Sequence, residues 1–181
     1  MVRAVFLDRD GVIIEDAGYI GEIGRVKFLP GASQAIRRLN EMNFKVIIVT
    51  NQAGVARGYF DEAAVREVNG YVRQKLAEES ATIDGIYYCP HHIDGTVEKY
   101  RQQCDCRKPN PGMLLSAARD FGIELSASFI IGDKESDIEA GRRAGCRTIR
   151  LAAADPPEPT AADYVARDLD QALAWLTGLQ K

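Results

Sequence analysis

The sequence lacks the features of several large classes of protein. None of its apolar runs approaches the roughly 20 residues that a membrane-spanning helix needs, and its first residues do not resemble a signal peptide. Its 23 basic and 26 acidic residues leave a formal net charge of −3, without the basic excess that is typical of nucleic-acid-binding proteins. We therefore expect a cytoplasmic protein that binds neither nucleic acid nor membranes.

Histidine and cysteine are scarce, and most of them lie close together. The two histidines are adjacent at positions 91 and 92, and three of the four cysteines lie between residues 89 and 106. This bunching favours a metal site over the disulfide framework of a secreted protein. Cys146 stands apart, and we interpret it as a buried structural thiol.

Short apolar runs alternate with helical segments along most of the 181 residues. The apolar runs lie near residues 4–7, 46–49, 86–88, 129–131 and 148–149. The helical segments lie near 33–42, 61–79, 112–121, 136–144 and 168–176. This alternation is typical of an α/β fold with a doubly wound parallel sheet. We expect one domain over residues 1–181, without a large cap domain, and a surface loop over residues 152–159.

The first apolar run leads directly into two acidic residues, Asp8 and Asp10. Because they are two residues apart, their side chains would lean the same way as the strand ends. At roughly 4 Å and an effective dielectric constant of about 20, two like unit charges repel each other by about 4 kcal/mol. A cation, a shared proton or strong donors must offset this repulsion, so the pair predicts a chemically active site.

Polar residues follow four of the predicted strands. The ligand site of a parallel α/β sheet lies outside the carboxyl ends of its strands, so these residues are expected to converge. Each one alone could be a helix cap, a turn residue or a solvated charge, but their agreement favours a common site. They are Asp8 and Asp10, then Thr50, Asn51 and Gln52, then Arg107 and Lys108 after a long loop, and finally Asp133, Lys134 and Asp137.

In order and spacing, these residues resemble the four motifs of the haloacid dehalogenase superfamily. The motifs are Asp8-Arg9-Asp10-Gly11-Val12, Thr50-Asn51-Gln52, Lys108 and Gly132-Asp133-Lys134-Glu135-Ser136-Asp137. Residues 16–19, 53–58, 89–92 and 104–109 further resemble the D-glycero-D-manno-heptose 1,7-bisphosphate 7-phosphatases. Related histidinol-phosphate phosphatases share much of this pattern.

The resemblance implies a Mg²⁺-dependent phosphatase that forms an aspartyl-phosphate. Asp8 would be the nucleophile, and Asp10 would protonate the leaving sugar oxygen and later deprotonate the hydrolytic water. Asp133 would bind Mg²⁺ together with Asp8 and the backbone carbonyl of Asp10. Thr50 and Lys108 would bind the transferring phosphoryl group.

The resemblance also implies a set of substrate contacts. Arg107 would contact the distal phosphate of a sugar bisphosphate. The other expected substrate-binding residues are Arg9, Asp16, Ala17, Gly18, Tyr19, Asn51, Gln52, Ala53 and Lys134. Tyr19 could equally be a packing aromatic residue, and Asp137 could either orient Lys108 or metal-bound water, or cap a helix.

The cysteine-rich segment, at about residues 89–106, predicts a second metal site. Cys89, His91, Cys104 and Cys106 offer three thiolates and one imidazole, a closed tetrahedral set that suits structural Zn²⁺. His92 is the alternative ligand, and cysteines that stay reduced without a metal are the other interpretation. Because the segment ends at Arg107 and Lys108, the metal would fix two cations at the substrate.

The resemblance implies a phosphatase that acts on a small phosphorylated sugar in nucleotide-activated heptose biosynthesis, and we expect a monomer. A histidinol-phosphate phosphatase is the alternative enzyme. A zinc-stabilised binding module with decayed catalytic residues is the alternative outside the enzymes. The intact set of acidic and phosphate-binding residues argues against that module.

Overall fold

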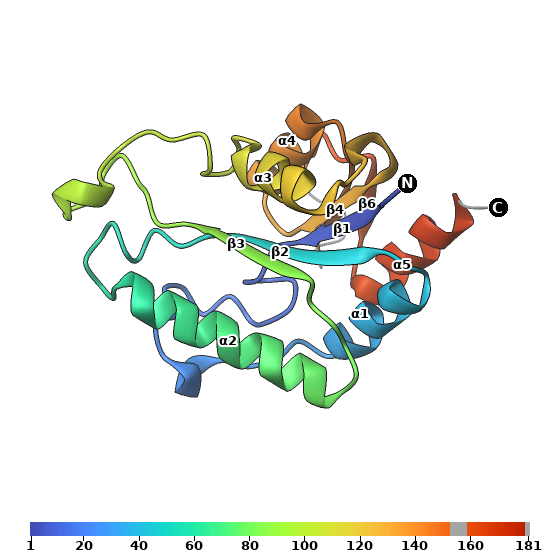
Figure 1. Ribbon diagram of the computed structural model, residues 1–181, viewed down its shortest axis with the longest axis horizontal. Helices are drawn as coiled ribbons and strands as arrows, with labels where there is room; N and C mark the ends of the chain where they lie inside the picture. The colour runs from blue at the N-terminus through green and yellow to red at the C-terminus, as the bar shows by residue number, and fades with distance from the viewer. Residues whose placement is uncertain (153–158, 180–181) are drawn as a thin grey trace.

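The computed structural model describes residues 1–152 and 159–179. A six-stranded sheet in the order β3-β2-β1-β4-β5-β6 runs through its middle (Figure 1). The strands are β1 (Ala4–Leu7), β2 (Lys45–Asn51), β3 (Gly85–Cys89), β4 (Phe129–Gly132), β5 (Arg147–Leu151) and β6 (Tyr164–Ala166). Every neighbouring pair is parallel. The predicted doubly wound α/β sheet is therefore confirmed, with β1 near its centre.

Helices cover both faces of the sheet. On one face lie α1 (Ala32–Glu41), α2 (Glu62–Glu78) and α5 (Leu169–Gly178); on the other lie α3 (Gly112–Phe121) and α4 (Glu135–Ala144) (Figure 1). The short helices are η1 (Ile23–Arg25), η2 (Glu98–Tyr100) and η3 (Leu125–Ala127). The sheet thus has an apolar core on each side.

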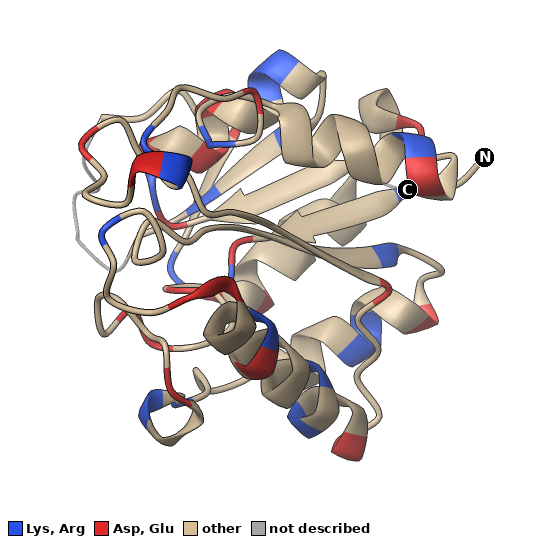
Figure 2. Cartoon of the chain, turned by 60° about the vertical axis from the view of Figure 1, so that its left-hand side comes forward, with Lys and Arg blue, Asp and Glu red and all other residues tan. Residues whose placement is uncertain are grey.

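The alternation of side chains along β1 explains the two cores. Val5 and Leu7 pack in the core beneath α1, α2 and α5, whereas Ala4 and Phe6 pack in the core beneath α3 and α4. Most of the length of the strands carries no charged residue, and charges gather on the helices and loops (Figure 2). A strand that is buried on both faces appears in the sequence as a continuous apolar run, which is why β1 could be predicted from the sequence.

The edge strand β6 was missed by the sequence analysis. It has three residues, of which only Ala166 is buried, and it pairs with β5 through Tyr164, Val165 and Ala166. So short a segment has no apolar run to detect. Residues 153–158 of the predicted loop over 152–159 lie outside the described residues.

The carboxyl ends of the strands face the long segment between β3 and α3. Residues 90–111 contain η2 as their one helix and form no strand. Within the part of the chain that the structure describes, no large cap covers this end of the sheet, as expected. None of the described helices has the length and apolarity that crossing a bilayer requires.

Candidate active site

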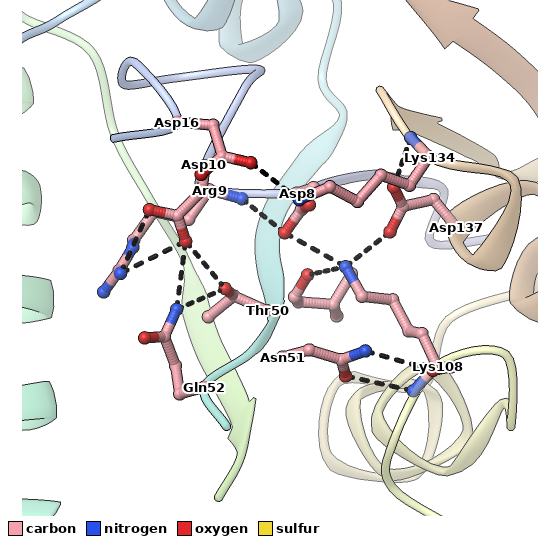
Figure 3. Close-up of polar contacts among 11 residues, drawn as sticks. Asp8, Arg9, Asp10, Asp16, Thr50, Asn51, Gln52, Lys108, Lys134 and Asp137 are labelled. Carbon is pink, nitrogen blue, oxygen red and sulfur yellow. Dashed lines mark hydrogen bonds and ion pairs between the residues drawn. The ribbon is translucent and has the colours of Figure 1, made fainter. Parts of the chain in front are cut away.

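Three carboxylates and one ammonium group meet at the carboxyl end of the sheet. Asp8 follows β1, and its Oδ1 lies 3.0 Å from Nζ of Lys108 (Figure 3). That Nζ lies 2.5 Å from Oδ1 of Asp137 and donates to the backbone carbonyl of Val49 at 2.7 Å. Asp133, after β4, offers an oxygen within 4.8 Å of oxygens of both Asp8 and Asp137. We call Asp8, Asp133 and Asp137 the acidic cluster.

Burial and mutual repulsion raise the pKa values of Asp8 and Asp133. Burial raises the pKa of Asp8 to about 7; Asp137 and Asp10 add to the rise, and Lys108 opposes it. Burial also raises the pKa of Asp133. Burial alone would lower the pKa of Lys108, but the carboxylates beside it outweigh burial and raise its pKa. The single ammonium group of Lys108 therefore does not balance the negative charge of the three carboxylates.

The acidic cluster fits a hard divalent cation. Among the described residues, the buried Oδ1 of Asp133 has no hydrogen-bond partner, and such an atom is costly unless it binds a ligand. Carboxylate oxygens are the ligands that Mg²⁺ and Ca²⁺ prefer. Gly11, with φ at 85°, lets the backbone approach closely, because a Cβ there would collide with the carboxylate of Asp133.

The side chain of Asp10 lies outside the acidic cluster. Its Oδ2 accepts hydrogen bonds from Nε2 of Gln52 at 3.0 Å and Oγ1 of Thr50 at 3.4 Å (Figure 3). Nε2 of Gln52 also donates to Oγ1 of Thr50 at 2.8 Å. The two aspartates after β1 thus have different environments, which suits them to different tasks.

The side chain of Arg9 lies in the protein interior. Its side chain is fully buried, with Nη1 donating to Oδ1 of Asn69 at 2.8 Å and Nη2 to Oδ1 of Asp10 at 3.2 Å. Its backbone N–H donates to Oδ1 of Asp8 at 2.8 Å. The protein interior therefore encloses the guanidinium, and two side chains hold it. The role of Arg9 in substrate binding stays a prediction.

Asn51 holds the backbone of Lys108. Its Nδ2 donates to the carbonyl of Lys108 at 3.0 Å, and the N–H of Lys108 donates to its Oδ1 at 3.0 Å (Figure 3). The end of β2 thereby fixes the position from which the Lys108 side chain reaches the acidic cluster. The role of Asn51 in substrate binding stays a prediction.

A cavity of about 580 Å³ opens beside Asp10 and Lys108. Its lining includes most of the residues that were expected to bind substrate, among them Asp16, Gly18, Tyr19, Ala53, Arg107 and Lys134. Ala17 lines a neighbouring hollow with Tyr59 and Phe60, and its role in substrate binding stays a prediction. His92 and Ser136 also line the cavity, and sequence reasoning did not assign either of them to it.

A flap, defined as residues 15–28, borders this cavity. Lys134 forms an ion pair with Asp16 at 2.8 Å, which joins the flap to the loop after β4 (Figure 3). Arg25 donates to the carbonyls of Tyr19 at 2.6 Å and Ala17 at 2.8 Å. Tyr19 packs edge-on against Tyr59 with centroids 4.8 Å apart, so it both packs and faces the cavity.

The cysteine-rich segment brings four ligand atoms together. Sγ of Cys106 lies 3.0 Å from that of Cys89 and 3.3 Å from that of Cys104. Nδ1 of His91 lies 3.5 Å from Sγ of Cys106. His92 Nδ1 instead accepts a hydrogen bond from the backbone of Asp94. The geometry therefore brings His91, rather than His92, to the three cysteines.

These four residues fit a closed tetrahedral metal site. The cysteines are free of disulfides, and the ligand atoms of all four residues lie within 4.8 Å of one another. The hydrogen bond between Cys106 and Cys89 lowers the pKa of Cys106 to about 5, which favours the thiolate form that a metal binds. Three sulfurs and one imidazole nitrogen leave no open coordination position for catalysis.

Known proteins resemble this chain along nearly its whole length. Residues 5–76 match the haloacid dehalogenase-like hydrolase family, and residues 105–172 match the HAD-hydrolase-like family. The D-glycero-beta-D-manno-heptose-1,7-bisphosphate 7-phosphatase of Escherichia coli (strain K12) is 46% identical over 179 aligned positions, which cover 95% of this chain and 94% of the relative. The protein of that name from Photorhabdus laumondii is 44% identical over 96% of this chain and 92% of its own length.

Solved structures share the fold. The D,D-heptose 1,7-bisphosphate phosphatase from B. bronchiseptica, complexed with magnesium and phosphate, has a TM-score of 0.83 and 32% identity, covering 98% of this chain and 99% of its own. An HAD-like phosphatase from Mesorhizobium loti has a TM-score of 0.87 and 35% identity over 98% and 87% of the two chains. The chain therefore belongs to the haloacid dehalogenase-like hydrolases and, within them, to the D-glycero-beta-D-manno-heptose-1,7-bisphosphate 7-phosphatase family.

Proposed function

We propose that this enzyme hydrolyses the 7-phosphate of D-glycero-D-manno-heptose 1,7-bisphosphate and releases heptose 1-phosphate. The observation that carries the proposal is the 46% identity to a phosphatase of this name over 95% of the chain. The grouping of acidic residues around Lys108 supports a phosphoryl-transfer site in particular. The proposal includes action in the cytoplasm, as a monomer, in the biosynthesis of nucleotide-activated heptose.

In the proposed reaction, Asp8 acts as the nucleophile. A carboxylate oxygen of Asp8 forms a bond to phosphorus as the bond from phosphorus to the sugar oxygen breaks, which gives an aspartyl-phosphate. Asp10 donates its proton to the departing sugar oxygen, and it then accepts a proton from the water that hydrolyses the intermediate. Lys108 and Thr50 bind the phosphoryl oxygens and offset their charge.

Two metals belong to this proposal. Mg²⁺ would be held by Asp8, Asp133 and the backbone carbonyl of Asp10, where it supplies positive charge to the phosphoryl group. Its binding would displace protons from the buried acids, so affinity falls as the pH drops below about 7, the pKa of Asp8 without a cation. Zn²⁺ would be held by Cys89, His91, Cys104 and Cys106 in a structural role.

The second phosphate of the substrate gives the proposed specificity its physical basis. Arg107 and Lys134 both line the cavity beside Asp10. Arg107 also donates to the carbonyl of His91 at 3.2 Å, which ties it to the cysteine-rich segment. A guanidinium group can bind a phosphate through two parallel hydrogen bonds, so Arg107 is suited to the distal phosphate.

A comparison of substrates tests the proposed function. We expect kcat/KM for heptose 1,7-bisphosphate to exceed that for histidinol phosphate by about 100-fold or more, because only the bisphosphate offers a second phosphate to Arg107. Both anomers of the bisphosphate should be assayed with Mg²⁺ by release of inorganic phosphate. A preference for histidinol phosphate would assign the enzyme to the alternative reaction.

Asp10→Asn tests the assignment of proton transfer. The amide keeps the size of the side chain but cannot donate or accept the transferred proton. We expect turnover of the bisphosphate to fall by about 10²- to 10⁴-fold, measured as steady-state phosphate release. An unimpaired rate would remove the acid–base role from Asp10. The thermal unfolding midpoint of the variant controls for a loss of folded protein.

A further inference from the structure

We infer that Asn69, acting through Arg9, fixes the direction of the Asp10 carboxylate and is a positioning residue for proton transfer to the leaving group. The inference rests on the proposed function, in which Asp10 is the general acid. It adds a residue of α2, outside all four sequence motifs, to the machinery of the reaction.

Asn69 is a buried polar residue on an otherwise apolar helix face. The other buried residues of α2 are Val65, Val68, Val72 and Leu76. A side-chain amide in such surroundings is costly unless its polar atoms are bonded. Oδ1 of Asn69 accepts a hydrogen bond of 2.8 Å from Nη1 of Arg9. This contact explains why the apolar face is interrupted at this position.

Arg9 connects Asn69 to Asp10. Its guanidinium is fully buried, and a buried charge requires a partner. Nη2 lies 3.1 Å from Oδ2 of Asp10 and 3.2 Å from Oδ1. Because the guanidinium is planar and rigid, holding Nη1 on Asn69 also sets where Nη2 lies.

The Asp10 carboxylate is held from two sides. Arg9 lies on one side of it, and Gln52 and Thr50 lie on another (Figure 3). Without the acceptor on Asn69, Nη1 of Arg9 becomes a buried donor without a partner, and the guanidinium can turn to seek another. The carboxylate then loses one of its two fixed supports, and its alignment with the leaving oxygen suffers.

The dependence of the rate on the leaving group tests this inference. An alkoxide leaves poorly without a proton, whereas 4-nitrophenolate leaves readily without one. The quantity to measure is kcat/KM for heptose 1,7-bisphosphate divided by kcat/KM for 4-nitrophenyl phosphate. The ratio does not depend on the fraction of protein that is folded, and kcat/KM covers the steps up to departure of the leaving group.

We expect Asn69→Leu to lower this ratio by about 10-fold or more, a part of the 10²- to 10⁴-fold effect of a general acid. Asn69→Asp, which keeps an acceptor for Nη1 of Arg9, should hold the ratio within about 3-fold of wild type. Val72→Ala is the matched control, since it removes a buried side chain from the same helix and should leave the ratio unchanged. Arg9→Lys gives a second test and should also lower the ratio, because one ammonium group cannot bond to Asn69 and Asp10 in the geometry of the guanidinium.

An unchanged ratio in both Asn69→Leu and Arg9→Lys would overturn the inference, whether each variant keeps its activity or loses it equally on the two substrates. If the wild-type enzyme does not act on heptose bisphosphate, the proposed function fails instead. The ratio can then be measured with histidinol phosphate, another alkyl phosphate, and the role of Asn69 is judged on that result.

Discussion

Replacing Asp8 by asparagine is expected to lower turnover by on the order of 10⁴-fold or more, to the limit of detection. In the proposed reaction its carboxylate forms the bond to phosphorus, and an amide at the same place is not a comparable nucleophile. The loss comes from the chemistry rather than from folding. The carboxylate of Asp8 is buried against Asp137 and Asp10, both of which raise its pKa, so a neutral amide removes repulsion.

Two measurements on Asp8→Asn separate these effects. Denaturing quench followed by mass spectrometry should find the phosphorylated protein in the wild type during turnover and none in the variant. The thermal unfolding midpoint should not fall. Asp170→Asn is a matched control, because Asp170 is an exposed carboxylate paired with Arg38 at the surface. Normal turnover by Asp8→Asn would exclude the covalent route.

Loss of zinc is the other change with a large expected effect. Structural zinc binds to finger peptides with about 10–16 kcal/mol of apparent free energy, and residues 90–111 have little other regular structure to hold them. Lys108 follows Cys106 by two positions, so disorder at the metal reaches the ammonium group beside Asp8. We expect Cys104→Ser to lose zinc, to unfold at a lower temperature, and to lose about 10-fold or more of its activity.

The adjacent histidines supply a matched pair for this test. His91→Ala should lose zinc, because Nδ1 of His91 faces the cysteines. His92→Ala should keep it, because Nδ1 of His92 bonds to the backbone of Asp94. Metal content can be measured by elemental analysis of the purified proteins. Zinc-free Cys104→Ser with the stability and activity of the wild type would contradict a structural role for the metal.

The sequence predicted the sheet and the convergence of its polar ends for a clear physical reason. Five of the six strands contain an apolar run that the sequence shows, as β2 does at Val46–Val49, and parallel strands bring their carboxyl ends to one edge of the sheet. β6 lacked such a run. The observed ends of α1 and α5 differ from the predicted ends by one or two residues, because helix ends depend on local caps.

The directions of individual side chains were harder to predict. The family resemblance placed Arg9 among the substrate-binding residues, but it did not indicate where the guanidinium lies. Alternation along an extended strand was the available signal that it faces another way, toward the layer that contains α2. For Asp137 both interpretations hold, since it accepts from the N–H of Lys134 at the start of α4 and pairs with Lys108.

The order of the strands divides the acidic cluster between two parts of the chain. Asp8 belongs to the part that builds β1, β2 and β3, whereas Asp133 and Asp137 belong to the part that builds β4, β5 and β6. The seam between them is the β1–β4 pairing, which ends in a hydrogen bond of 3.1 Å from the N–H of Asp8 to the carbonyl of Ile131. A cation held by Asp8 and Asp133 would therefore connect the two parts of the chain across the β1–β4 pairing. Because it would bind only the folded sheet, its binding would raise the free energy of unfolding.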